Sequence, residues 1–318
     1  MDGYGQIIYN NGTIYTGEFK NNLKHGKGKL TYDNNILYEG SYHLDNKNGL
    51  VKYKLCDVSI YDGDWLDDTM SGIGTSTYSN GDIYQGDWVD GNMHGYGIMS
   101  YSNGDTYKGD WSCGLKNGQG YYFYERGNVF EGQFLNDSLF KGKMIYSSGN
   151  VYSGDWKNDR MNGHGIFMMI TGYKYEGEWK DDMPNGKGKA TFVNGSVYEG
   201  DYKNGMKHGK GVMVDHNGDI YEGKWVDDIK SGYGVMIYKQ KGDEFDGMWE
   251  DGMKNGPGKM QYANGDIYVG NWMNDLKSSS GKMWYSSGNM YKGNFQEDER
   301  SGLGEYTDSD GCYYKGEW

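Results

Sequence analysis

Aromatic and polar residues alternate in short segments that recur along the whole chain. The pattern aromatic-x-Gly-x-aromatic occurs fourteen times at a spacing of 23 residues, apart from one step of 22 and one of 24. The alternation has the period of a β-strand, and no segment shows the 3.6-residue period of a helix. The sequence therefore predicts an almost entirely antiparallel β-structure, with at most isolated helical turns. The patterns start at Tyr15, Tyr38, Tyr61, Tyr84, Tyr107, Phe130, Tyr152, Tyr175, Tyr198, Tyr221, Phe245, Tyr268, Tyr291 and Tyr314.

Each pattern is followed by a return segment with a Gly-x-Gly pair, which predicts a β-hairpin. In the unit that begins at Tyr84, the hairpin loop is expected to centre between Gly91 and Asn92. Large rings then face glycines across the hairpin, which stabilises an otherwise weak glycine-containing strand. We therefore expect three opposed pairs: Trp88 with Gly95, Gly86 with Gly97, and Tyr84 with Met99.

The odd period constrains the turns between hairpins. Two loops of even length would present the aromatic residues on alternate faces of the sheet. One turn in each unit must therefore add an odd residue. The Asn-Gly turns, such as Asn80-Gly81, can do so as three-residue loops with glycine in the left-handed conformation.

The amino-acid composition favours a thin sheet over a globular domain. The 318 residues include 55 Gly and 32 Tyr, and only 36% are hydrophobic, so large apolar cores are not expected. A net charge of −13 argues against nucleic-acid binding, which depends on basic residues. Without a long apolar run or a signal peptide, a cytoplasmic location is expected. Three widely spaced cysteines, Cys56, Cys113 and Cys312, are expected to be free thiols in a reducing compartment.

The repeated residues resemble the MORN (membrane occupation and recognition nexus) repeat family. Residues 84–107 match nearly in full, including His94-Gly95-Tyr96-Gly97. The resemblance implies a single-layer antiparallel sheet of stacked hairpins, an elongated twisted rod. We expect residues 1–318 to form one continuous array of about thirteen to fourteen units from Tyr15, with partial units at both ends. At ~4.8 Å per strand it would be roughly 125 Å long. Local irregularities are expected at Val51, at Lys141-Gly142-Lys143 and at Ser278-Ser279-Ser280.

No residues indicate catalysis, a cofactor or a metal site. His25, His94 and His208 share one position of the repeat, but repeats separate them by far more than a zinc–ligand distance. No residues remain outside the repeats to build a catalytic domain, so the chain is expected not to be an enzyme. Carboxylates recur beside the repeat glycine and should form a solvated acidic ladder opposite the aromatics: Glu18, Asp64, Asp87, Asp110, Asp155 and Glu178.

The aromatic stripe is the predicted binding surface, because a single layer cannot bury both of its faces. Trp179 and Trp225 should lie close to Gly186 and Gly232, so that Gly186→Val would overpack Trp179 and cost roughly 1–3 kcal/mol. Replacing Asp201 or Glu178 on the other face should cost about 0.5 kcal/mol at most. The partner-binding groove is expected to comprise Tyr84, Trp88, Tyr107, Trp111, Tyr175, Trp179, Tyr198, Tyr221, Trp225, Trp249, Tyr268 and Trp272.

The predicted function is a non-enzymatic scaffold that binds protein partners, cytoskeletal or membrane-associated, through this groove. Exposed strand edges favour self-association as a homodimer, and family members suggest the C-terminal repeats as the contact. The alternatives are a phosphoinositide-binding peripheral membrane module and a regulatory arm of a larger enzyme. Acidic hairpin tips oppose binding to anionic lipid. Lipid headgroups could nevertheless contact Lys24, Lys27, Lys29, Lys203, Lys207 and Lys210.

Overall fold

The computed structural model describes residues 1–33, 35–55 and 59–318. These residues form β-strands joined by turns, and none of them lies in a helix. The predicted all-β, single-layer antiparallel sheet of stacked hairpins is confirmed. The strands fall into two units, Met1–Asp159 and Arg160–Trp318. The single continuous array expected from the sequence stays a prediction.

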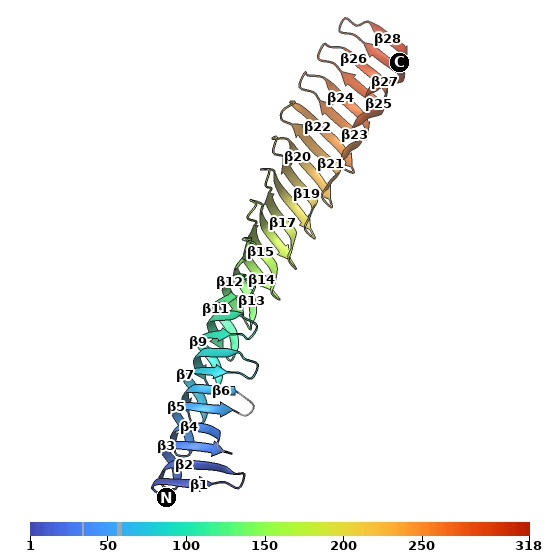
Figure 1. The fold of residues 1–318 in the computed structure, drawn as a ribbon. Coiled ribbons are helices and arrows are strands. Elements are labelled where there is room, and N and C mark those ends of the chain that lie inside the picture. Colours follow the sequence, from blue (N-terminus) through green and yellow to red (C-terminus); the bar gives the residue numbers. More distant parts are fainter. Residues whose placement is uncertain (34, 56–58) are drawn as a thin grey trace. The chain divides into compact units, whose positions relative to one another are not determined.

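The first unit, coloured blue to green in Figure 1, is a succession of hairpins in which consecutive strands pair antiparallel. Its strands are β1 (Gly3–Ile8), β2 (Thr13–Lys20), β3 (Leu23–Tyr32), β4 (Asn35–His43), β5 (Asn46–Leu55), β6 (Ser59–Leu66), β7 (Thr69–Thr77), β8 (Ile83–Val89), β9 (Asn92–Ser100), β10 (Thr106–Ser112), β11 (Leu115–Phe123), β12 (Val129–Leu135), β13 (Ser138–Ile145) and β14 (Val151–Lys157).

The second unit, coloured green to red, repeats the same plan of consecutive antiparallel strands (Figure 1). Its strands are β15 (Arg160–Met168), β16 (Lys174–Lys180), β17 (Met183–Thr191), β18 (Val197–Lys203), β19 (Met206–Val214), β20 (Ile220–Val226), β21 (Ile229–Tyr238), β22 (Asp243–Glu250), β23 (Met253–Gln261), β24 (Ile267–Met273), β25 (Leu276–Trp284), β26 (Met290–Gln296), β27 (Glu299–Thr307) and β28 (Tyr313–Glu317).

The turns between hairpins form as predicted. In the loop between β7 and β8, the Tyr78 amide donates to the Asp82 carbonyl at 2.8 Å, and the Gly81 amide donates to the Tyr78 carbonyl at 3.0 Å. Gly81 has φ of +92°, the left-handed conformation. This is a three-residue loop closed by a glycine bulge. Its odd length keeps the aromatic side chains of successive hairpins on one face.

The turn inside each hairpin differs from the prediction. β8 and β9 are joined by the two residues Asp90 and Gly91, both with positive φ, and Val89 pairs with Asn92. The loop therefore centres one residue earlier than expected, and Trp88 opposes Met93 instead of Gly95. The predicted pairs of Gly86 with Gly97 and of Tyr84 with Met99 are correct.

A bulge in β9 reconciles the two registers. Between the Gly86–Gly97 pair and the Asp87–His94 pair, the return strand carries two extra residues, Gly95 and Tyr96. Gly95 has φ of +57°, which glycine adopts readily and most residues do not. Two added residues preserve the alternation of faces, so the sequence pattern alone does not reveal the bulge.

The core of each unit is a ladder of rings on one face of the sheet. The ring of Tyr84 lies edge-on between Trp88 at 5.2 Å and Trp111 at 5.3 Å. The Tyr84 hydroxyl donates to the Asp87 carbonyl at 3.0 Å. A Cβ atom at Gly97 would lie 2.5 Å from Cζ of Tyr84, so the ring requires a glycine beneath it. The expected stacking of rings on glycines is therefore present, and it crosses from one hairpin to the next.

Candidate functional site

The twelve predicted groove residues lie on the ring face of their units, but the stripe that they form is closed. Tyr84, Tyr107, Tyr175, Tyr198 and Tyr268 are fully buried, and the tryptophans of the set are at most 6% exposed. The expectation that this stripe remains partly open is therefore wrong. The ring ladder is the core of the protein, and whether it also binds a partner stays untested.

Cationic side chains help to close the ring face. The Lys116 ammonium lies 5.3 Å from the ring centre of Tyr122, 5.7 Å from that of Tyr101 and 5.9 Å from that of Tyr107. It also lies 3.8 Å from the Asp137 carboxylate. Burial lowers the pKa of Lys116. Lys207 and Lys254 occupy the same position in the second unit, above Trp225 and Trp272 respectively. Cation–π contacts thus seal the stripe from solvent.

The open hollow of the second unit lies on the opposite face. It is a groove of about 1080 Å³ that crosses β16 to β21, and we call it the glycine-floored groove. The floor consists of the backbone of glycines whose absent side chains would point to the ring face, away from the groove. These glycines are Gly177, Gly188, Gly200, Gly211 and Gly223.

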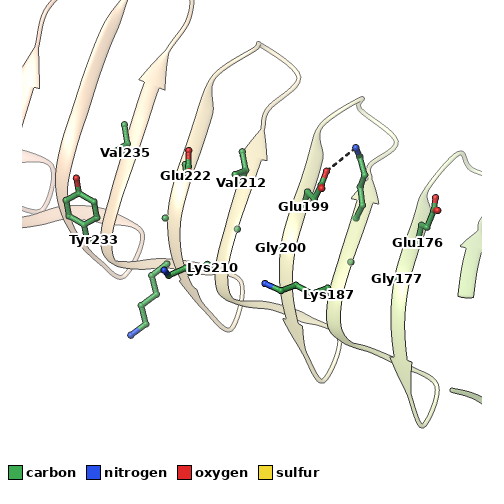
Figure 2. A pocket seen from close by; sticks show the side chains of 15 residues that line it. Glu176, Gly177, Lys187, Glu199, Gly200, Lys210, Val212, Glu222, Tyr233 and Val235 are labelled. Atoms are coloured by element: carbon green, nitrogen blue, oxygen red, sulfur yellow. Dashed lines mark ion pairs between the residues drawn. The ribbon is translucent and has the colours of Figure 1, made fainter. Parts of the chain in front are cut away.

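Charged side chains flank this floor on both sides. Figure 2 shows Glu176, Glu199 and Glu222 along one side of the glycines, and Lys187 and Lys210 along the other. The first side also carries Val212 and Val235, and the second carries Lys224 and Tyr233. Tyr233 is 58% exposed. The groove therefore offers charges of both signs together with accessible apolar surface.

The charges of the groove are only partly neutralised within the protein. The Lys189 ammonium lies 3.1 Å from the Glu199 carboxylate, and Lys187 forms an ion pair with Asp201. Lysine and hydrogen-bond contacts lower the pKa of Asp201. Lys210 and Lys224 face each other across β19 and β20 instead of facing a carboxylate. The part of the groove over β19 to β21 thus has unused hydrogen-bonding capacity.

Smaller hollows lie on the same face of each unit. One of about 730 Å³ in the second unit is lined by Trp284, Lys282, Lys292 and Leu303, among others. One of about 440 Å³ in the first unit lies beside Tyr4, Lys27 and Leu50. The sequence does contain their signal, namely the polar positions that alternate with the aromatics. These positions share no residue type, and the sequence marks only their lysines, such as Lys27 and Lys210, as possible lipid contacts.

The carboxylate ladder is not simply solvated, because several of its members accept backbone N–H groups, and the small cost expected for replacing them stays a prediction. The Asp87 carboxylate accepts the backbone N–H of Tyr96 at 3.0 Å, inside the bulge. Equivalent bonds join Asp110 to the Gln119 amide at 2.8 Å and Asp201 to the Lys210 amide at 2.9 Å. Glu178 accepts from the Lys187 amide at 3.0 Å in the same way. These carboxylates satisfy amides that the bulge removes from the strand ladder.

Gly186 is constrained by a different neighbour from the one predicted. Trp179 opposes Gly163 of the preceding strand, and its indole N–H donates to the Gly165 carbonyl at 3.1 Å. A Cβ at Gly186 would instead lie 2.5 Å from a carboxylate oxygen of Glu178. Gly186 also has φ of +104°. Likewise, Gly232 opposes Trp249, so each tryptophan covers a glycine of the preceding hairpin.

Within each unit, the lysines considered for lipid binding do not share one surface. Lys24 and Lys207 lie on the ring face, 5.2 Å and 4.7 Å from the ring centres of Tyr42 and Trp225. Lys27 and Lys29 line the small hollow of the first unit, and Lys210 lines the glycine-floored groove. The remaining one, Lys203, is an exposed residue at the end of β18.

The histidines and cysteines named in the sequence analysis form no cluster among the described residues. The rings of His25 and His43 are 5.5 Å apart, and His208 lies 3.3 Å from Asp227. Over residues 1–33, 35–55 and 59–318, no cluster of three or more His, Cys, Asp or Glu side chains is placed to hold a metal ion. Cys113 and Cys312 are free and exposed, whereas Cys56 lies outside the described residues. In the same described part of the chain, no helix could span a membrane.

Known structures resemble the chain only weakly. The TCP10 domain of Danio rerio CPAP, solved in complex with a peptide of Danio rerio STIL, is 13% identical with a TM-score of 0.30, over 84% of this chain and 98% of that one. The SAS-4 (dCPAP) TCP domain of Drosophila melanogaster, in complex with a proline-rich motif of Ana2, is 12% identical with a TM-score of 0.28, over 61% and 86%. Virginiamycin B lyase from Staphylococcus aureus is 12% identical with a TM-score of 0.14, over 100% and 95%.

The comparison with protein families is decisive. A search of curated proteins finds no match. The model of the MORN repeat matches eleven times and covers well over half of the chain, at residues 15–36, 61–83, 84–106, 107–129, 152–172, 175–197, 198–220, 221–242, 245–267, 268–290 and 291–313. The units at Tyr38 and Phe130, where irregularities were expected, are not matched, whereas the unit at Tyr268 is. The chain belongs to the MORN repeat family.

Proposed function

We propose that this chain is a non-enzymatic scaffold that binds protein partners, and that the glycine-floored groove is a principal binding surface. Membership of a family of repeat arrays supports a scaffold. The single observation that carries the choice of surface is burial. The rings are sealed on one face, while the other face is hollowed over β16 to β21 and presents Tyr233, Val212 and unpaired lysines. An exposed concave surface of mixed character is suited to a protein partner.

A site-specific crosslinking experiment tests this assignment. A photoreactive residue is placed at Tyr233 in the groove of the full chain, and a matched one at Lys203, which is exposed outside the groove. Partner proteins should crosslink through position 233 and much less through position 203. Equal labelling at both positions, or labelling at position 203 alone, would show that the groove is not the principal surface.

The setting and the oligomeric state are finer parts of the proposal. We propose a cytoplasmic scaffold, cytoskeletal or peripheral to a membrane, that self-associates through strand edges whose backbone groups can pair with another chain. Sedimentation over a range of protein concentrations tests the association. A purely monomeric chain at high concentration would contradict the homodimer without affecting the groove. Binding to phosphoinositide vesicles would favour the alternative of a lipid-binding module.

A further inference from the structure

Two pairs of lysines face each other directly on the open face of the second unit. Lys210 on β19 opposes Lys224 on β20, and Lys282 on β25 opposes Lys292 on β26. In the strand registers that the structure describes, these are the two places where lysine opposes lysine. Other lysines on this face oppose carboxylates, as Lys189 opposes Glu199, or uncharged residues, as Lys108 opposes Tyr121. Lys292 also opposes Glu305 on β27, on the side away from Lys282.

This arrangement is unfavourable in the free protein. Residues directly opposed on antiparallel strands have Cα atoms about 4.5–5.5 Å apart, and like charges placed so are destabilising. None of the four ammonium groups forms an ion pair with a described residue. The chain has more carboxylates than basic residues, with a net charge of −13. The two lysine–lysine pairs therefore do not result from a shortage of acidic residues.

Both lysine pairs lie in the hollows of this face. Lys210 and Lys224 line the glycine-floored groove beside Tyr233, and Lys282 and Lys292 line the hollow that contains Trp284. Trp284 is 38% exposed, so each pair has an accessible aromatic side chain nearby. An anionic group of a ligand would lie between the two ammonium groups. An apolar group next to it on the same ligand would contact the ring of Tyr233 or Trp284.

We propose that these two pairs are anion subsites that bind the carboxylates of an acidic protein segment. The inference rests on the proposed function, because it specifies the partner chemistry of the same face. The pairs are six strands apart, which is ~29 Å at ~4.8 Å per strand. An extended segment advances about 3.4 Å per residue, so its two acidic positions are separated by roughly nine residues.

An anionic membrane fits this surface less well than a protein segment. Glu222 lies beside the first lysine pair and Glu305 beside the second. Both carboxylates would repel a uniformly anionic lipid surface. A polypeptide can place acidic residues at the lysine pairs and neutral or basic residues next to Glu222 and Glu305. Its charges would then be complementary to those of the protein surface.

The test uses the full chain and a synthetic peptide of about twelve residues, long enough to span both pairs at ~3.4 Å per residue, with two glutamates about nine residues apart and glycine and serine at the other positions. Lys210→Met and Lys282→Met should each weaken its binding roughly fivefold, and because the sites are far apart the double variant should show about the product of the two effects. Lys210→Arg, which keeps the charge, should bind normally. Lys203→Met is the matched control, since it removes an exposed lysine outside both hollows.

A second measurement separates binding from folding. Removing one charge of a like-charged pair should leave the melting temperature of the free protein unchanged or raise it. Peptide affinity unaffected in both Met variants, or lowered equally in Lys203→Met, would overturn the proposal. So would loss of binding to phosphatidylserine vesicles with unchanged peptide affinity, because the ligand would then be lipid. Crosslinking at position 233 without any lysine dependence would leave the groove assignment standing and refute only the acidic segment.

Discussion

At the scale of single residues, the tyrosine rings determine where glycine is required. Gly188 has no unusual φ, yet a Cβ there would lie 2.5 Å from Cζ of Tyr175. We predict that Gly188→Ala destabilises the fold by roughly 1–3 kcal/mol through overpacking. Chemical denaturation of the wild-type chain and the variant measures the difference.

A double-mutant cycle with Tyr175→Leu identifies the cause of that loss. Shortening the ring should relieve the clash, so Gly188→Ala should cost clearly less in the Leu background than in the wild type. Gly211, where a Cβ would lie 2.5 Å from Cζ of Tyr198, serves as the control glycine, because the cost of Gly211→Ala should not depend on Tyr175. Equal costs in both backgrounds would mean that the ring is not the obstacle.

The carboxylate ladder leads to a second prediction at this scale. Asp87→Ala removes the acceptor of the Tyr96 amide, which lies in the bulge and has left the strand ladder. We expect a loss of about 1 kcal/mol, typical of a side chain that satisfies a backbone donor. Asp87→Asn retains an acceptor oxygen and should lose less. If both variants melt like the wild type, water satisfies that amide equally well.

At the scale of elements, the acidic residues of the hairpin tips hold left-handed positions. Glu297 and Asp298 form the turn between β26 and β27, with φ of +49° and +70°. The Asp298 carboxylate also accepts the Lys277 amide of the preceding hairpin at 2.8 Å. The tips that argued against lipid binding in the sequence are thus structural as well, because Asp and Asn tolerate this conformation.

Glu297→Asn should therefore stabilise the fold. Glutamate gains no local hydrogen bond in the left-handed region, whereas asparagine is among the residues that visit it routinely. We expect a gain of up to about 1 kcal/mol. Asp298→Ala, which loses the contact to Lys277, should have the opposite sign. Thermal denaturation of the two variants measures both effects, and a loss of stability in Glu297→Asn would contradict this account of the turn.

The same elements show what could be read from the sequence. The strand order and the three-residue Asn-Gly loops could be predicted from the period of 23 residues. An odd repeat length requires one loop of odd length in each unit if the aromatic residues are to stay on one face. The two-residue tips and the bulge at Gly95 could not be predicted, because two extra residues leave the alternation of side chains between the two faces unchanged. The partners predicted for Trp179 and Gly186 were wrong for this reason.

The candidate site was harder to predict than the fold. Sequence reasoning took the aromatic stripe as open because a single layer has two exposed faces. It could not show that Lys116 and its equivalents lie over the rings and close that face. The glycine-floored groove lies on the other side of the sheet, over the backbone of the same glycines. Its residues share a position but no residue type, so no pattern marked them.

At the scale of the whole molecule, the sequence predicts one continuous array. Thirteen intervals of two strands at ~4.8 Å correspond to a length of roughly 125 Å. Small-angle scattering of the full chain should give a maximum dimension near this value for the monomer. A much smaller dimension would show that the units Met1–Asp159 and Arg160–Trp318 fold back on each other.

The ladder also makes the stability of the whole protein sensitive to alkaline pH. Burial raises the pKa of Tyr15 and Tyr221 from 10.0 to about 12, and other ladder tyrosines shift in the same direction. In the unfolded chain these hydroxyls ionise near pH 10, whereas in the folded chain they stay neutral. The ladder thus contributes its full stability below pH 10 and loses it as the pH rises toward 12.

Buried lysines act in the opposite direction, because burial lowers the pKa of Lys230 and Lys254 and favours folding as they lose their protons. The tyrosines should dominate, since nearly every repeat contains one whose hydroxyl is buried. We therefore predict that the melting temperature, followed by circular dichroism, falls steeply between pH 10 and 12. Tyrosinate absorbance should rise together with unfolding. Gradual ionisation of most tyrosines near pH 10, with the β-signal intact, would mean that solvent reaches the ladder and that the ring face is open after all.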